Sequence, residues 1–501
     1  MTTMPEPSEF AARFLGAPHR LLIDGAWVDG RAEPIAVENP SRGTLLTQVQ
    51  AASAADVDHA VQAARAALDG PWGRMSGRDR AAILFRFADL LDCHAEDMAE
   101  VMALDNGQQR AVCVAMVRVL AGDLIRYYAG WATKIAGDSF LPSLGGSRAQ
   151  TEYMVATLRE PIGVVGAIVP WNAPAGMIAL KIGPALAAGC TVVLKTAELA
   201  PLTGEFFGAL LLEAGLPPGV FNMIHGLGTE AGAALAAHPG VDKIAFTGST
   251  AVGRQIVAAA MGNLKKVSLE LGGKSPVIAF GDADLDALVP GAAMGCLVAS
   301  GQACMAGTRL FAHDDIHDEL VARISDYADN LKVGDALCGD TILGPLISAR
   351  QRERVEGYIA SGLAEGARIA NRYSRWEGPG YFVRPVIFAD ATSAMRIARE
   401  EIFGPVLTVI RFTDEQQMLR EVNGTEYGLS GSVWTQDITR ALRVARQVDS
   451  GQVGINVHAA VSPETPFGGN KQSGWGREFG EEGLQPYLKT KAISINLGAR
   501  A

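Results

Sequence analysis

The chain has 501 residues, of which 48% are hydrophobic and 20% are charged, and its formal net charge at pH 7 is −10. This length exceeds what one hydrophobic core usually supports, so we expect two or more domains. The acidic balance argues against a nucleic-acid partner. Six cysteines without a CxxC pair argue against a disulfide scaffold and a zinc site. His225 and His458 have no partner at metal-ligand spacing, so both are interpreted as structural and no metal is expected.

The N-terminus and the apolar stretches predict a cytoplasmic protein. The opening residues, MTTMPEPSEF, are acidic and contain proline, unlike a secretory signal. The longest apolar stretches are broken by proline and glycine before they reach the roughly 18 residues that a membrane span requires. We therefore expect no membrane partner.

Residues 1–50 predict short edge strands, and residues 54–135 predict a layer of helices. The first segment alternates apolar and polar residues between turns (LLIDGAWVDG, TLLTQVQAA). In the second segment, apolar residues recur three and four positions apart. Ser76 and Asp79 suit the start of the second helix in this layer.

From residue 163 the pattern changes to short apolar strands that alternate with helices. Strands are expected at GVVGAIV, TVVLK, GVFNMI and KIAFTG. This alternation predicts a parallel sheet, and the ligands of such sheets bind at the carboxyl ends of the strands. The motifs PWN, KTAE, HGLG and FTGST all fall at those ends, so this sheet is expected to bind a ligand.

A second series of strands and helices runs from SPVIAF to VGINV. We therefore predict an α/β fold with two Rossmann-like parallel-sheet domains and a small β arm. The first domain is expected to span 1–139 and 162–271, and the second 272–472. Strand-like segments at 140–161 and 485–501 can pair with each other or between subunits, which predicts an oligomerisation arm.

Three side chains with complementary chemistry predict a covalent active site. Cys304, in SGQACMAGTR, lies 34 positions after Glu270 of SLELGGKSP and 132 positions after Asn172 of IVPWNAP. A thiolate that attacks a carbonyl group needs a base and an oxyanion donor. Glu270 lies at an apolar strand end, where a raised pKa would suit a general base. The alternatives are a structural glutamate and a small buried cysteine.

Two further motifs suit a dinucleotide. FTGSTAVG places Gly248 and Ser249 at the start of a helix, where free N–H groups can bind a pyrophosphate; a simple helix cap is the alternative. LKTAE places Lys195 and Glu198 just after a strand. The carboxylate there can accept both hydroxyls of a ribose, although a solvated ion pair would look the same in the sequence.

Together these residues resemble the aldehyde dehydrogenase superfamily. PWN, LKTAE, FTGSTAVG, LELGGKSP, GQAC, EEIFGPVL and PFGGNKQSGWGRE occur in the order and spacing of that family, and weaker similarity covers nearly the whole chain. The resemblance implies that Cys304 is the nucleophile, Asn172 the oxyanion donor and Glu270 the base. It also implies that Lys181 and Glu478 form a proton relay behind Glu270.

The resemblance also implies a cofactor site for NAD, with NADP possible, in the first domain, and a catalytic second domain. Lys195 and Glu198 would hold the adenosine ribose, and Ser249 would contact the pyrophosphate. Glu401 would bind the nicotinamide ribose, with Phe403 packed near the nicotinamide ring. The remaining cofactor-binding positions would be Trp171, Gly248 and Gly272.

The implied reaction oxidises an aldehyde to its carboxylic acid with NAD⁺, through a thiohemiacetal and a thioester on the cysteine. Ala173, Met177 and Ala303 are small or aliphatic, so we expect a wide apolar tunnel that suits an aromatic or medium-chain aldehyde. Gly301 and Gly307 are expected to leave room around the sulfur. The family forms dimers and tetramers, and we expect a homo-oligomer, either a homotetramer or a dimer.

Three other functions compete with this interpretation. A coenzyme A-acylating semialdehyde dehydrogenase would pass the acyl group to a thiol, and Glu270 argues against it because such relatives commonly lack this base. A non-catalytic binding or structural relative would not need every reactive residue type. A cysteine esterase without a cofactor would leave the KTAE and FTGST motifs unexplained.

Overall fold

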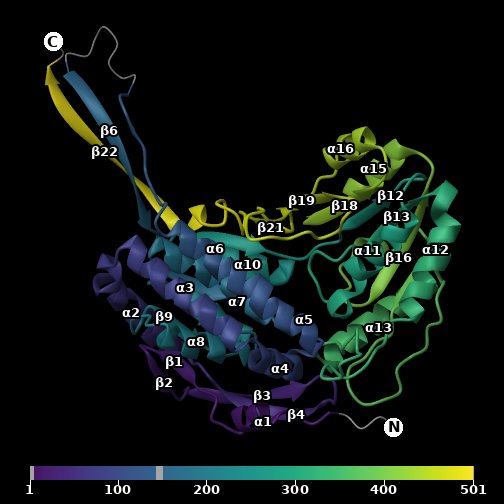
Figure 1. Cartoon of the computed structure of the whole chain (residues 1–501), viewed down its shortest axis with the longest axis horizontal. Coiled ribbons are helices and arrows are strands. Elements are labelled where there is room, and N and C mark those ends of the chain that lie inside the picture. The colour runs from purple at the N-terminus through teal and green to yellow at the C-terminus, as the bar shows by residue number, and fades with distance from the viewer. Residues whose placement is uncertain (1–4, 143–150, 500–501) are drawn as a thin grey trace.

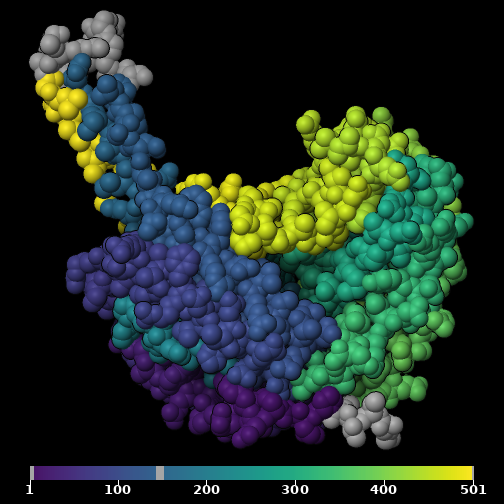
Figure 2. Space-filling view, in the orientation of Figure 1, coloured from purple at the N-terminus to yellow at the C-terminus, as the bar shows by residue number. Residues whose placement is uncertain are grey.

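The computed structural model describes residues 5–142 and 151–499, which form two α/β bodies and a projecting β arm (Figure 1). Within these residues, the first body contains an eight-stranded sheet and the second a seven-stranded sheet. The central strands of both sheets run parallel, so the predicted α/β fold is confirmed. Figure 2 shows the arm standing clear of both bodies.

Short hairpins and a layer of helices make up the N-terminal part, as predicted. The structure adds helix α1 (Glu9–Leu15), which has too few residues for a clear apolar period and is capped by Ser8. Ser76 caps α3 by accepting a hydrogen bond from the backbone N–H of Asp79, as expected. The other elements are β1 (Leu21–Ile23), β2 (Ala26–Val28), β3 (Ala32–Asn39), β4 (Thr44–Ala51), α2 (Ala54–Asp69), η1 (Trp72–Arg74), α3 (Gly77–Cys93), α4 (Ala95–Asn106), α5 (Arg110–Ala115), the π-helical η2 (Met116–Gly122) and α6 (Asp123–Trp131).

The first sheet has the strand order β2-β1-β9-β8-β7-β10-β11-β21. Its five inner strands are parallel and buried on both faces except at the start of β11, which explains their short apolar runs. These strands are β7 (Val164–Ile168), β8 (Thr191–Lys195), β9 (Phe221–Ile224), β10 (Lys243–Thr247) and β11 (Lys266–Glu270). The helices between them, and the edge strand, are α7 (Pro174–Ala188), α8 (Thr203–Glu213), η4 (Gly228–Gly232), α9 (Ala233–Ala237), α10 (Thr250–Ala260) and β21 (Gly474–Trp475).

The second sheet has the strand order β14-β15-β16-β13-β12-β18-β19. All its strands except β14 run parallel to their neighbours, as the second βα series predicts. The strands are β12 (Pro276–Ala279), β13 (Arg309–His313), β14 (Arg368–Ile369), β15 (Val386–Ala391), β16 (Val406–Phe412), β18 (Ser430–Trp434) and β19 (Gln452–Ile455). The helices are α11 (Leu285–Leu297), η5 (Val298–Gly301), α12 (Asp314–Asp329), α13 (Ala349–Ala364), α14 (Arg396–Arg399), α15 (Glu415–Asn423) and α16 (Ile438–Ala445).

The arm is a three-stranded antiparallel sheet with the order β22-β6-β5. Strand β6 (Thr151–Pro161) pairs with β22 (Leu488–Ala499) along its whole length, so the expected pairing of the two segments with each other is confirmed. The short strand β5 (Ser139–Phe140) was not predicted. Residues 143–150 and 500–501, which the sequence assigns to the arm, lie outside the described residues.

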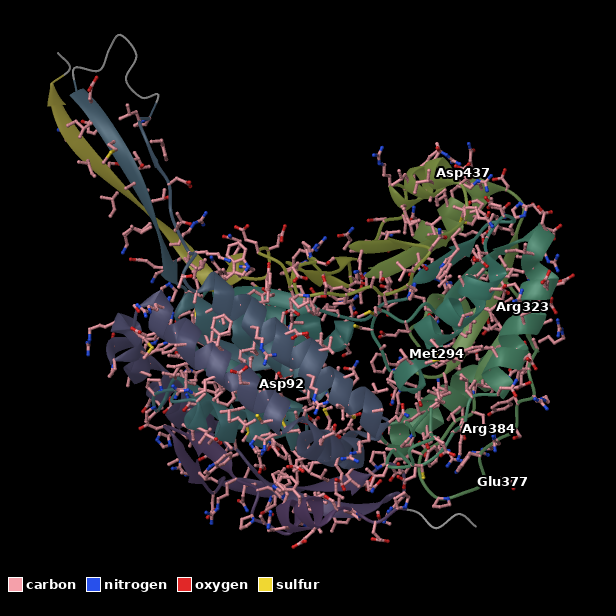
Figure 3. All side chains as sticks on the ribbon, in the orientation of Figure 1. Asp92, Met294, Arg323, Glu377, Arg384 and Asp437 are labelled. Carbon is pink, nitrogen blue, oxygen red and sulfur yellow. The ribbon has the colours of Figure 1, made fainter. Side chains whose placement is uncertain are left out.

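Each body has its own hydrophobic core. The two clusters that pack on the first sheet draw mainly on residues 11–271, and the two on the second sheet on residues 277–448. Figure 3 shows side chains filling the space between the sheets and the helices that cover them. In the described part of the chain, no helix is long and apolar enough to cross a bilayer. Two short strands, β17 (Tyr427–Gly428) and β20 (Asn470–Lys471), pair separately, and η6 (Gln485–Tyr487) precedes the arm.

Candidate active site

Cys304 lies in a tight turn that leads into β13 of the second sheet. The backbone N–H of Ala306 donates to the carbonyl of Ala303 at 3.1 Å, which places Cys304 and Met305 at the centre of the turn. The Cys304 side chain is partly buried and packs against the core of the first body. The nucleophile candidate therefore belongs to a loop of the second body but faces the first.

The backbone before this turn is strained. Ala299, Ser300 and Gly301 all have positive φ angles, of 52°, 55° and 73°, a region that only glycine adopts without cost. A Cβ atom on Gly301 would lie 2.1 Å from the carbonyl oxygen of Gly404. The expectation that Gly301 leaves room around the sulfur is therefore wrong, because this glycine accommodates a neighbouring backbone.

Burial raises the pKa of the Cys304 thiol to about 12, and the carboxylates of Glu270 and Glu401 add to the rise. Hydrogen bonding from the backbone N–H groups of Met305 and Cys304 acts in the opposite direction. The thiol is therefore protonated at neutral pH. It also lies close enough to both carboxylates for their charges to be felt, which brings Cys304, Glu270 and Glu401 into one site.

Asn172 follows β7 and connects the first sheet to the nucleophile loop. Its side-chain Nδ2 donates to the carbonyl of Gln302 at 2.9 Å, two residues before Cys304. Asn106 donates to the carbonyl of Trp171 at 2.5 Å, and Gln108 donates to that of Asn172. The sequence analysis missed both of these supports, since they lie 65 and 64 positions away and carry no motif of their own.

Glu270 is the last residue of β11, and its side chain is buried. Neither carboxylate oxygen makes a hydrogen bond of good geometry within the described residues, although the Gly469 N–H lies close enough to lower the pKa somewhat. Burial raises the pKa of Glu270 well above its usual value, and the charge of Glu478 adds to the rise. A raised pKa is what the apolar strand end predicts.

Lys181 and Glu478 form a buried ion pair next to Glu270. Lys181 lies on α7, and its Nζ donates to Oε1 of Glu478, which follows β21. The second oxygen of Glu478 has no hydrogen-bond partner within the described residues. Glu478 raises the pKa of Glu270 and Lys181 lowers it, so the structure brings together the three residues for which the resemblance implies a proton relay.

The two residues of the KTAE motif form an ion pair at the end of β8. Lys195 Nζ lies 2.8 Å from Glu198 Oε2. The Lys195 side chain is only 3% exposed whereas that of Glu198 is 39% exposed, so this is not the fully solvated pair of the alternative interpretation. One carboxylate is thus fixed by a buried cation and remains open to solvent beside the sheet.

The FTGST turn combines a helix cap with a link to Glu270. The hydroxyl of Ser249 accepts a hydrogen bond from the backbone N–H of Val252 at 3.3 Å and caps α10. The backbone N–H of Gly248 donates to the carbonyl of Glu270 at 3.0 Å. Ser249 is exposed at the helix N-terminus, where a phosphate is favoured.

Glu401 and Phe403 lie on a loop that connects α14 to β16. Oε1 of Glu401 accepts a hydrogen bond from the Gly273 N–H at 3.0 Å, and burial raises the pKa of this carboxyl. A Cβ atom on Gly272 would lie 2.4 Å from Glu401 Oε2. The rings of Phe403 and Trp171 meet edge to face at 5.3 Å. The four predicted cofactor positions therefore form two contacting pairs, Glu401 with Gly272 and Phe403 with Trp171.

Both histidines that the sequence analysis interprets as structural are engaged by other side chains. His225 contacts Thr196 Oγ1 at 2.7 Å and Glu205 Oε1 at 3.3 Å. His458 bridges Ser432 and the carbonyl of Met305. Among the described residues, no group of three or more His, Cys, Asp or Glu side chains is arranged to hold a metal ion.

Comparisons with known proteins agree with this geometry. Residues 27–493 match the model of the aldehyde dehydrogenase family. The chain is 45% identical over 501 residues to an aldehyde dehydrogenase of Alternaria alternata, which covers 99% of this chain and 97% of that protein. The structure matches that of a Bacillus cereus aldehyde dehydrogenase in complex with NAD⁺ with a TM-score of 0.95 and 40% identity, over 98% of this chain and 99% of the other. The chain therefore belongs to the aldehyde dehydrogenase family.

Proposed function

We propose that this chain oxidises an aldehyde to its carboxylic acid with NAD⁺, using Cys304 as the covalent nucleophile. The observation that carries the proposal is that the Cys304 turn meets Asn172 and Glu270 at the junction of the two bodies. A nucleophile, an oxyanion donor and a base are the groups that acyl chemistry on a thiol requires. Family membership supports the same reaction class.

In the first step the Cys304 thiol loses its proton to solvent water, and the resulting thiolate attacks the aldehyde carbon. The C–S bond forms and negative charge develops on the aldehyde oxygen in a thiohemiacetal. The backbone N–H of Cys304 would donate to that oxygen, and so would the second N–H of the Asn172 amide, whose first N–H donates to the Gln302 carbonyl. Donors fixed in advance stabilise developing charge without having to reorganise. Loss of hydride from the thiohemiacetal leaves a thioester on Cys304.

Bound NAD⁺ would supply the hydride acceptor, which no side chain of the chain provides. The residues present fit this cofactor: Glu198 offers an open carboxylate for a ribose, and Ser249 marks a free helix N-terminus for the pyrophosphate. Glu401, Gly272 and the Trp171–Phe403 pair would hold the nicotinamide end. The Glu198 carboxylate would repel a 2′-phosphate, so we infer a preference for NAD over NADP.

Hydrolysis of the thioester is assigned to Glu270. Its carboxylate would take a proton from water as the water oxygen attacks the acyl carbon, and the C–S bond then breaks to release the acid and the Cys304 thiolate. A raised pKa makes a carboxylate a stronger base at neutral pH. The Glu478 carboxylate would receive the proton from Glu270, while the Lys181 ammonium group holds Glu478 in place through the buried ion pair.

Removing the nucleophile or the base should block different steps. We expect Cys304→Ala to lower NAD-dependent aldehyde oxidation by at least about a thousandfold, because no thiohemiacetal can form. Glu270→Gln should lower steady-state turnover by about a hundredfold or more, since the thioester is no longer hydrolysed efficiently. A first-turnover burst of reduced cofactor should survive in Glu270→Gln. Absorbance of the reduced cofactor measures both variants and the unmodified protein.

The acyl acceptor separates this function from its competitors. Free carboxylic acid should be the product in water, and added coenzyme A should not convert it to an acyl-thioester. An acyl-coenzyme A product would favour the acylating alternative instead. Full oxidation by Cys304→Ala would remove Cys304 from the mechanism. Ester hydrolysis without any aldehyde oxidation would point to a cysteine esterase.

The pKa of Cys304 gives a pH dependence that can be measured without substrate. Because burial places this pKa at about 12, alkylation of Cys304 by iodoacetamide should still be rising with pH at pH 9. Glu270→Gln removes a negative charge that raises the thiol pKa. Alkylation of Cys304 should therefore be faster in this variant than in the unmodified protein at each pH where Glu270 is ionised. Peptide mass spectrometry separates Cys304 from the exposed Cys93.

The control for this measurement is Glu353→Gln, which neutralises an exposed carboxylate on α13. Its alkylation profile should match that of the unmodified protein. A Glu270→Gln profile that coincides with both would mean that the two side chains do not interact.

We propose an aromatic or medium-chain apolar aldehyde as the substrate. Asn172 is followed by Ala173, and Met177 and Val461 are partly buried and pack on the same core as Cys304. With NAD⁺, kcat/KM should rise from acetaldehyde to octanal and benzaldehyde. Ala173→Phe should lower it about tenfold for benzaldehyde, by the loss of fit in an apolar pocket. A kcat/KM that is highest for acetaldehyde would contradict the proposal.

We also propose that the chain forms a homo-oligomer, a tetramer or a dimer, through its arm. The arm exposes large apolar side chains to solvent, which is unfavourable in a monomer and is typical of a subunit interface. These are Phe140, Tyr153, Leu158, Ile493, Ile495 and Leu497. Light scattering should give two or four chains per particle. The double change Ile493→Glu and Ile495→Glu should reduce that number, whereas Ser494→Glu on the opposite face of β22 should have less effect.

Two further inferences rest on the same observations. The six cysteines are all free thiols, which fits the reducing environment of the cytoplasm. We also assign the first sheet to an NAD-binding domain (1–139 and 162–271), the second to a catalytic domain (272–472), and the remaining segments 140–161 and 485–501 to oligomerisation.

A further inference from the structure

A chain of three side chains connects β18 to the residue after the nucleophile. Trp434 Nε1 lies 3.1 Å from Ser432 Oγ, and Ser432 Oγ lies 2.9 Å from His458 Nδ1. His458 Nε2 lies 2.9 Å from the carbonyl oxygen of Met305. Ser432 and Trp434 are buried. The proposed mechanism uses none of these three side chains.

The direction of every hydrogen bond in this chain is fixed by its two ends. The Trp434 indole N–H can only donate, so Ser432 Oγ accepts from it. The Met305 carbonyl can only accept, so His458 carries its proton on Nε2 and accepts from the Ser432 hydroxyl on Nδ1. Burial lowers the pKa of His458, which keeps the ring neutral. One tautomer is therefore selected, and its N–H points at the nucleophile turn.

Two glycines flank the His458 ring, and neither position has space for a side chain. A Cβ atom on Gly295 would lie 3.0 Å from the His458 ring, and one on Gly307 would lie 2.9 Å from it. The Gly307 N–H donates to the Gly295 carbonyl at 3.0 Å. Gly307, like Gly301, therefore accommodates a neighbour rather than leaving room around the sulfur. The ring is enclosed between α11 and the nucleophile loop.

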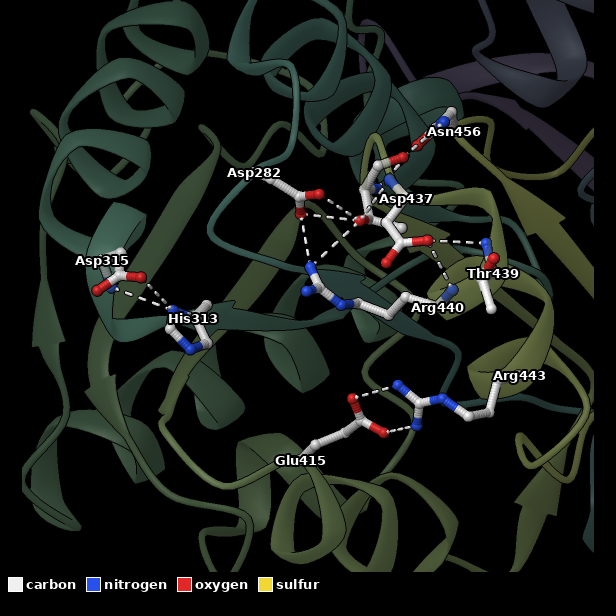
Figure 4. A network of polar contacts seen from close by, with 10 residues as sticks. Asp282, His313, Asp315, Glu415, Asp437, Thr439, Arg440, Arg443 and Asn456 are labelled. Atoms are coloured by element: carbon white, nitrogen blue, oxygen red, sulfur yellow. Dashed lines mark hydrogen bonds and ion pairs between the residues drawn. The ribbon is translucent and has the colours of Figure 1, made fainter.

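The loop that carries His458 is itself fixed. Asn456 exchanges two hydrogen bonds with the backbone of Thr435, both at 3.0 Å, directly after β18. The Thr435 hydroxyl donates to Asp282 at 2.8 Å, and Arg440 donates to the same carboxylate at 2.9 Å (Figure 4). The start of the loop thus cannot shift without breaking these hydrogen bonds. They fix the position of the His458 backbone relative to the nucleophile turn.

We propose that His458 is a positioning residue that holds the Ala303–Ala306 turn in the conformation in which Cys304 can attack an aldehyde. It binds the carbonyl of Met305, and the backbone N–H of the same residue lies close enough to the Cys304 thiol to lower its pKa. Because the turn is only four residues long, rotation of Met305 would displace both the sulfur and the Cys304 N–H. The inference rests on the proposed function of Cys304.

The decisive comparison is between His458→Phe and His458→Gln. Phenylalanine keeps the planar ring but loses both hydrogen bonds, whereas the glutamine amide can place an N–H where Nε2 lies. We expect His458→Phe to slow alkylation of Cys304 by iodoacetamide about tenfold, and to slow the first-turnover burst of reduced cofactor by a similar factor. His458→Gln should recover most of both rates. NAD affinity should change less than twofold in either variant.

Ser432→Ala gives a second route if His458→Phe does not fold. It removes the hydroxyl that donates to His458 Nδ1 but leaves the ring and its bond to the Met305 carbonyl, so a smaller loss of alkylation rate is expected. His238→Gln, which alters a partly buried histidine paired with Asp58 in the first body, is the matched control and should leave every rate unchanged.

Three results would overturn the proposal. These are an unchanged alkylation rate in His458→Phe, equal damage in His458→Phe and His458→Gln, and a lower melting temperature with no change in Cys304 reactivity. Alkylation needs neither aldehyde nor cofactor, so it tests the positioning role separately from the proposed function. If Cys304→Ala still oxidised aldehydes, the proposed function would fail instead, whatever the alkylation rates.

Discussion

The hydrogen bond from the Asn172 amide to the Gln302 carbonyl is the contact on which the proposed chemistry depends. Asn172 follows a strand of the first sheet, whereas Gln302 lies in the connection to the second. One bond therefore holds the proposed oxyanion donor next to the turn that carries the proposed nucleophile. Gln302 is fixed in turn, because its Oε1 accepts from the Ile347 N–H at 2.9 Å. Catalytic groups must be held within about 0.5 Å of their working positions, which loosely joined bodies would not achieve.

Burial at the junction of the two bodies raises the pKa of both the proposed nucleophile, Cys304, and the proposed base, Glu270. The reason is that an apolar environment disfavours the charged form of each group. Two adjacent anions in an apolar site would repel each other strongly. The Lys181–Glu478 pair places a cation and a further anion beside Glu270, at the desolvation cost that any buried ion pair carries. This desolvation cost is consistent with the proposed transfer of a proton from Glu270 to the buried pair.

The sequence predicts those parts of the site that are encoded locally. Strand ends and glycine turns identify Glu270, Glu198 and Ser249, because each lies beside a short apolar strand or opens a helix. Asn106 and Gln108 could not be found in this way, since their contacts with the Trp171–Asn172 turn exist only in the folded chain. The role of His458 is hidden for the same reason: its partners Ser432 and Met305 lie 26 and 153 positions away.

The small residues around Cys304 have a different meaning in the structure than in the sequence. Gly301 lies against the Gly404 backbone, and Gly307 lies against the His458 ring, so neither opens space for a substrate. The left-handed run that ends at Gly301 is retained although it is unfavourable, and such strain persists only where the surroundings over-determine it. Here the Ser300 hydroxyl donates to the Gly344 carbonyl at 2.6 Å on one side of the turn, and His458 holds Met305 on the other. The glycines therefore allow close backbone packing, and that packing immobilises the nucleophile.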